Sequence, residues 1–191
     1  LAWKAQLEPF DYHDAAAMAP FKSLRDQAYL YGIFGGVPRY LAPVSTDRSL
    51  AENVADLVLS PRGEVRGQVE TAILQEQGLR DLPKYIGILA AVGGGQTELA
   101  EIAARAGLAH DTSLRDKVER LVSLGYVEKH QNFEAGRTSP YRYRLADPAF
   151  MFYHTFVSDL ETALEKNDPM EVWTASVQPQ VDTYMGHLFE R

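Results

Sequence analysis

The side chains best suited to bind a partner are cations at two neighbouring places in the chain. Between Leu82 and Asp147 the sequence holds nine Lys or Arg residues and eight Asp or Glu residues, a net charge of +1, whereas the rest of the chain carries −8. Cations gathered on one helix and an adjacent hairpin are suited to contact the phosphates of double-stranded DNA. The residues that we expect to bind DNA are Ser113, Arg115, Lys117, Arg120, Arg137 and Arg142.

The same stretch also admits a plainer interpretation. Asp116 and Glu119 alternate with the cations, as they do on an ordinary solvated helix surface. A local net charge of +1 supports little counterion release, and the whole chain is acidic, with a formal charge of −7. DNA and a protein partner therefore both stay open as ligands of this stretch.

The sequence lacks the residue patterns of a catalytic or metal site. It contains no Gly-x-x-x-x-Gly-Lys-[Ser/Thr] string, and the glycines at 93–95 follow a predicted helix and lack the lysine of a phosphate loop. The five histidines lack the spacing of zinc ligands, and the absence of cysteine excludes thiolate ligands and disulfides. We expect no catalytic residue and no bound metal. Lack of cysteine fits a cytoplasmic setting, and no apolar run is long enough to span a membrane.

The elements that must position these cations are almost all helical. Ser60-Pro61, Asp147-Pro148 and Asp168-Pro169 each combine an N-cap oxygen with a proline suited to the first helical position. Strands are expected only at residues 126–129 and 141–145, on either side of a polar turn. Helices are expected at residues 12–19, 23–34, 39–43, 50–59, 61–77, 83–92, 97–106, 112–124, 149–166 and 170–190.

The middle of the chain has the most specific order of elements. A helix over 97–106 is closed by Gly107, and a second helix, with Thr112 or Ser113 as its N-cap, is closed by Gly125. Two short helices, a strand, a loop and a second strand resemble the winged helix-turn-helix family. The apolar face of the second helix is expected to consist of Leu114, Val118, Leu121 and Val122.

A glycine–proline string in the first third of the chain, YGIFGGVPRYL at residues 31–41, is its most distinctive motif. Gly35 and Gly36 end one helix and permit close backbone approach, while Pro38 sets the start of the next helix. The string resembles the GG-x-P-x-Y motif in the helical lid of an archaeal and bacterial group of AAA+/STAND-type P-loop ATPases. The resemblance implies that this turn binds ATP or ADP through Gly35, Gly36, Pro38 and Arg39. Gly36 and Pro38 would face the adenine, and Arg39 would approach the phosphates.

The resemblance to these ATPases continues along the chain, through YIGILAAVGGGQTELAEIAARAG, LRDKVERLVSLGYVEK and YRYRLADPAFMFYHTFV. It implies a mainly α protein: a helical lid bundle at 1–80, a winged helix-turn-helix with a small β-hairpin at 81–147, and two helices at 148–191 that open a nuclease-like domain. The P-loop core, and with it ATP hydrolysis, would lie upstream of Leu1. The missing initiator Met and the uncapped end at Arg191 agree with the expectation that the chain is a piece of a longer protein.

The function implied by this resemblance is a switch without catalysis of its own. Nucleotide held between the ATPase core and the lid would set the lid orientation, and the winged helix would pass that state to DNA or to a protein partner. The alternative is a stand-alone winged-helix transcriptional regulator with helical dimerisation flanks. The oligomeric state stays open in both interpretations.

Overall fold

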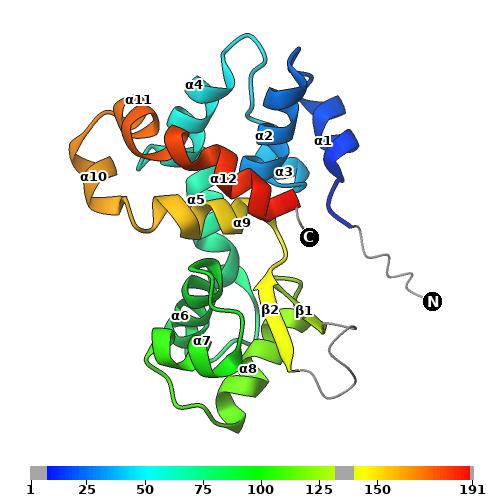
Figure 1. The fold of residues 1–191 in the computed structure, drawn as a ribbon, viewed down its shortest axis with the longest axis vertical. Helices are drawn as coiled ribbons and strands as arrows, with labels where there is room; N and C mark the ends of the chain where they lie inside the picture. The colour runs from blue at the N-terminus through cyan, green and yellow to red at the C-terminus, as the bar shows by residue number, and fades with distance from the viewer. Residues whose placement is uncertain (1–7, 132–139, 190–191) are drawn as a thin grey trace. The chain divides into compact units, whose positions relative to one another are not determined.

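The fold is mainly helical with one small antiparallel sheet, as the sequence predicts (Figure 1). The structure is a computed structural model, and it describes residues 8–131 and 140–189. Its contacts divide the described residues into two compact units. We call residues 8–68 and 162–189 the helical unit, and residues 69–161 the mixed unit. The predicted boundaries at residues 80 and 147 stay a prediction; in the contacts, residues 69–80 and 148–161 group with the middle segment.

The helical unit is built from short helices drawn from both ends of the chain. Helix α2 packs against α1, α4 and α12, and α11 packs against the π-helical turn 55–59. Its buried core is apolar, with Leu30, Phe34 and Leu59 fully enclosed. Its elements are α1 (Tyr12–Met18), α2 (Leu24–Phe34), α3 (Pro38–Leu41), α4 (Leu50–Val54), the π-helical turn Ala55–Leu59, α10 (Glu161–Lys166, which begins one residue before the unit), α11 (Pro169–Val172), the π-helical turn Trp173–Val177 and α12 (Gln178–Phe189).

Helix α12 is fastened to α2 by polar contacts as well as by packing. Tyr184 donates its hydroxyl hydrogen to the carbonyl of Gly32 over 2.7 Å. On the surface, Arg25 donates to both carboxylate oxygens of Asp182, at 2.8 and 2.9 Å, and Tyr29 donates to the same carboxylate. The hydrogen bonds from Tyr29 and Arg25 lower the pKa of Asp182. Because the Arg25–Asp182 pair is exposed, it orients the helices more than it stabilises them.

The mixed unit surrounds one apolar helix, α6. This helix packs against α7, α8, β2 and the π-helical turn 153–157, and it buries Ile88 and Leu89 completely. The elements of the unit are the end of α5 (Glu64–Ala72, which begins in the helical unit), the 3₁₀ turn Ile73–Gln75, α6 (Leu82–Gly93), α7 (Leu99–Ala106), α8 (Thr112–Ser123), β1 (Val127–Gln131), β2 (Tyr141–Leu145), α9 (Pro148–Phe152) and the π-helical turn Tyr153–Val157.

The two strands pair antiparallel, with Val127 opposite Leu145 and Gln131 opposite Tyr141. Within β2, Tyr143 and Leu145 are buried while Arg142 points outward, so the alternation predicted from the sequence is confirmed. The backbone N–H of Tyr143 also donates to the carbonyl of Thr97 over 2.8 Å. The segment just before α7 therefore adds a single strand-like contact to the free edge of β2.

Local capping signals account for most helix ends. Asp147 and Asp168 accept backbone N–H groups at the starts of α9 and α11, and Gly107 and Gly125 adopt positive φ after α7 and α8, as predicted. The N-cap predicted at Ser60 is wrong. Residues 61–63 form a turn, with Gly63 N–H donating to the Ser60 carbonyl, and α5 begins at residue 64.

Candidate functional site

Helix α8 is anchored by one apolar stripe, and most of its remaining side chains are exposed or partly exposed. Leu114, Val118 and Leu121 are at most 2% exposed, whereas Val122, predicted to join them, is half-buried. The predicted N-cap, Thr112 or Ser113, is wrong. The cap is Asp111, whose carboxylate accepts the Leu114 N–H over 3.0 Å. Asp111 is better suited to this place because its charge also complements the helix dipole.

The predicted cations of α8 do not share one face. Spacing of four and three residues places Ser113, Lys117 and Arg120 along one flank of the helix, where Lys117 donates to the Ser113 hydroxyl over 3.0 Å. Arg115 lies on the opposite flank, next to the hairpin. Asp116 lies on the outward surface between these flanks. We name Ser113, Lys117 and Arg120 the basic flank; no carboxylate in the described part of the chain pairs with its two cations.

The cations of the hairpin are held by acidic partners. Arg142, predicted to contact DNA, binds Glu98 over 2.9 Å and also donates to the Thr97 hydroxyl. Arg144 binds Glu128 across the strands over 2.6 Å. Such exposed pairs are weak, so they can exchange partners with little loss of stability. Arg137, the remaining predicted DNA contact, lies outside the described residues.

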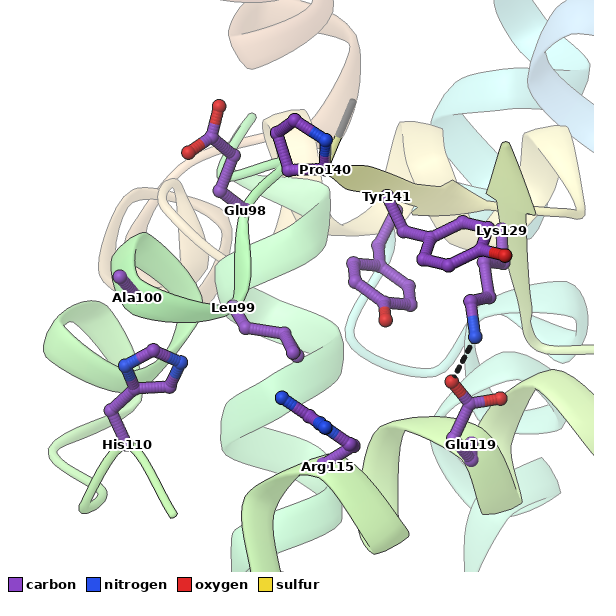
Figure 2. A pocket seen from close by; sticks show the side chains of 10 residues that line it. Glu98, Leu99, Ala100, His110, Arg115, Glu119, Lys129, Pro140 and Tyr141 are labelled. Atoms are coloured by element: carbon purple, nitrogen blue, oxygen red, sulfur yellow. Dashed lines mark hydrogen bonds and ion pairs between the residues drawn. The ribbon is translucent and has the colours of Figure 1, made fainter. Parts of the chain in front are cut away.

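A groove of about 400 Å³ separates the start of α7 from α8 and the hairpin (Figure 2). In this view Arg115 lies between His110 and the Lys129–Glu119 ion pair, with Leu99 across from it. The ammonium of Lys129 also lies 4.1 Å from the centre of the Tyr141 ring, and its hydrogen bond to Glu119 raises the pKa of Lys129. The groove is therefore a mixed polar and aromatic site with one guanidinium near its middle.

The sequence pattern does not predict this groove. Its lining comes from α7, the turn before α8, α8 itself and both strands, so no single string contains it. The signal that the sequence does contain is the pair Tyr141 and Tyr143, two residues apart on a strand and hence on one face. Two aromatic side chains on one face of a hairpin indicate a contact surface, but not what lies opposite.

The glycine–proline turn has the backbone geometry that its sequence indicates. Gly35 ends α2 at φ 69°, a conformation open to glycine, and Pro38 occupies the first turn of α3. Gly36 is buried, and its carbonyl accepts the Phe10 N–H over 2.7 Å. Pro38 and Arg39 are exposed. The turn therefore presents Pro38 and Arg39 to solvent, whereas the Phe10 backbone covers Gly36; the nucleotide contacts of all four residues stay a prediction.

Two titratable groups of the mixed unit, Asp147 and His154, each have a buried polar atom and do not line the groove. Burial raises the pKa of Asp147 to about 6, against the opposing pull of hydrogen bonds from the Ala149 and Phe150 backbone. Burial lowers the pKa of His154 to about 4, and its Nδ1 has no hydrogen-bond partner. In both groups burial disfavours the charged form.

The described residues contain neither a candidate metal site nor a helix that could span a membrane. These residues include no group of three or more His, Asp or Glu side chains placed to hold a metal ion. Within the same part of the chain, no helix is long and apolar enough to cross a membrane. The chain was also compared with protein family models, with curated proteins and with solved structures, and none of them matches it.

Proposed function

We propose that the mixed unit is a winged helix-turn-helix in which α8 is the recognition helix. The support is the order α6, α7, α8, β1, β2 around one apolar core, together with the bond from Tyr143 N–H to the Thr97 carbonyl. The tight turn between α7 and α8, closed by the left-handed Gly107, leaves α8 exposed along two flanks.

The ligand that we propose for this unit is double-stranded DNA. The observation that carries the proposal is the basic flank, where Lys117 donates to the Ser113 hydroxyl and Arg120 lies further along α8, in its last turn. Neither cation has a carboxylate partner among the described residues. Hydroxyl and cationic groups there can reach phosphates and base edges together. Because Asp116 is close by, we expect affinity to be modest and strongly salt-dependent.

Replacing Lys117 and Arg120 together by alanine is expected to weaken binding of the chain to a 25-base-pair duplex by about tenfold at 50 mM salt. Each lost phosphate contact should also lower the slope of log affinity against log salt by about 0.9. Fluorescence anisotropy of a labelled duplex, titrated at several salt concentrations, measures both quantities.

The matched control for this double variant is Arg62→Ala, which removes an exposed arginine in the helical unit. It should leave the affinity and the salt slope unchanged. If the wild-type chain does not bind the duplex at 50 mM salt, or if the double variant keeps the full slope, DNA is not the ligand. A protein partner would then be the remaining candidate.

A second function is favoured by the glycine–proline turn. We propose that this chain is the non-catalytic part of a P-loop ATPase, in which exposed Pro38 and Arg39 face ATP or ADP held by an upstream core. The support is the way the turn is held: Gly35 adopts a left-handed φ, and the Phe10–Gly36 hydrogen bond fixes the backbone beneath the two exposed side chains. A fixed turn loses little entropy when a ligand binds.

The nucleotide role predicts an effect in the intact ATPase. Pro38→Ala combined with Arg39→Ala should weaken ADP binding about tenfold, equivalent to about 1.4 kcal/mol. Isothermal titration of the full-length protein measures this change, with exposed Lys22→Ala as the control in the same unit. Unchanged ADP affinity in the double variant would favour the stand-alone DNA-binding regulator instead.

A further inference from the structure

The groove beside α8 contains one cation whose charge is not already balanced. Four of its lining residues carry full charges: Glu98, Arg115, Glu119 and Lys129. Glu119 pairs with Lys129, and Glu98 pairs with Arg142 from the neighbouring strand. Among the described residues no carboxylate pairs with Arg115. An anion that binds Arg115 therefore breaks no existing ion pair.

The charged residues that line the groove also limit the charge that a ligand can carry. One unpaired guanidinium matches one negative charge, and its planar fork suits a carboxylate bidentately. A doubly charged phosphate would leave its second charge facing Glu98 and Glu119. His110, on the turn before α8, is exposed and adds a polar edge to the groove. A monoanion is therefore favoured.

The apolar residues that line the groove indicate what the uncharged part of such an anion would be. Leu99 and Ala100 line one side of the groove, and the exposed ring of Tyr141 lines the hairpin side, with the buried Tyr143 beside it on β2. Tyr141 is 49% exposed, so part of its ring is available for stacking. The volume of about 400 Å³ lies at the small end of the range for small-molecule sites.

We propose that this groove is a binding site for a small aromatic carboxylate. The carboxylate pairs with Arg115, and the ring packs between Leu99 and the exposed ring of Tyr141 (Figure 2). The site is separate from the basic flank, because Lys117 and Arg120 do not line it. Binding of the carboxylate and binding of DNA can therefore be tested independently, although both would place charge near α8.

Titration of the full chain with 2-naphthoate, followed by ¹H–¹⁵N spectra, tests this site. Saturable shifts are expected at Leu99, Ala100 and Tyr143 and in α8 around Arg115. Arg115→Ala should weaken naphthoate binding at least tenfold, and Arg115→Lys should have an intermediate effect because lysine keeps the charge but loses the fork. Arg105→Ala, which removes an exposed arginine of α7 outside the groove, should leave the affinity unchanged.

Three results would overturn the proposal. Naphthoate shifts that do not saturate would show that there is no site. Equal affinity for 2-naphthol, which lacks the carboxylate, would remove the role of Arg115. Equal affinity for inorganic phosphate would reduce the site to a non-selective anion contact. In contrast, full naphthoate binding by the Lys117→Ala, Arg120→Ala double variant would support the groove even where DNA binding fails.

Discussion

Gly36→Ala is expected to lower the free energy of unfolding of the helical unit by about 3 kcal/mol. A Cβ at this position would lie 2.9 Å from the carbonyl carbon of Phe10, and closer still to its oxygen. Both atoms are backbone, so no side chain can rotate away to relieve the overlap. The chain before α1 would have to move, which would break the Phe10–Gly36 hydrogen bond and loosen nearby packing.

Tryptophan fluorescence can isolate this effect. The chain has two tryptophans, Trp3 and Trp173, and Trp173 is buried in the helical unit. In a Trp3→Phe background, urea denaturation followed by Trp173 emission reports the stability of that unit. The matched control is Gly186→Ala in α12, where an added Cβ meets no atom within 4 Å. That variant should gain about 0.5–1 kcal/mol from helix propensity. Equal midpoints for Gly36→Ala and the parent would contradict the close approach.

Acidification from pH 7.5 to pH 4 is expected to destabilise the wild-type mixed unit by about 3 kcal/mol relative to a His154→Gln variant. The pKa of His154 is about 4 in the folded protein, against an ordinary value of 6.5. Above pH 6.5 the imidazole is neutral in both the folded and unfolded states, so it has no effect on stability. As the pH falls below 6.5, His154 becomes protonated in the unfolded state but stays neutral in the folded state until the pH nears 4. The free energy of unfolding therefore decreases.

Asp147 has the opposite effect on stability over nearly the same pH interval as His154. Its pKa of about 6 lies above the ordinary value of 3.8, so stability is lost as the pH rises from about 4 to 6. Asp147→Asn keeps an N-cap oxygen and removes the buried charge, so this variant should gain up to about 3 kcal/mol at pH 7. In the wild type the opposite effects of His154 and Asp147 on the pH dependence of the free energy of unfolding largely cancel. Each single variant should therefore show the pH dependence caused by the group that remains.

The dependence of the free energy of unfolding on pH can be measured by urea titration at several pH values. Hydrogen-exchange mass spectrometry of peptides from residues 82–93 reports on the mixed unit, because α6 is at its centre. A third variant, carrying both substitutions, should show little dependence on pH beyond that of the other titratable groups. Parallel pH profiles for the wild type and His154→Gln would show that the imidazole is not buried in its neutral form.

Local signals predicted the helices because their causes are local. Asp147 and Asp168 cap helices through hydrogen bonds that span two or three residues, and Gly107 and Gly125 end helices through their own φ. The failure at Ser60 shows the limit of such signals. Ser60-Pro61 matches a helix start, yet Gly63 approaches the backbone of Leu57 closely, and this contact places a turn where the pattern favours a helix.

The sequence by itself determined the class of the fold, the positions of nearly all helices, the strand pair and the special backbone of the Gly35–Pro38 turn. These features depend on residues a few positions apart. The environment of the cations was decided only by tertiary structure. Arg115 and Lys117 are two residues apart in the sequence, yet Arg115 lines the groove and Lys117 lies on the basic flank.

Long-range contacts explain this difference. Arg142 forms an ion pair with Glu98, which is 44 positions away in the sequence. Lys129 pairs with Glu119 only because β1 packs against α8. A side chain's charge can be read from its type, but whether that charge is free for a ligand depends on which carboxylates the folded chain brings within 4 Å. The same packing leaves Arg115 without such a partner in the described residues and makes the groove a candidate site.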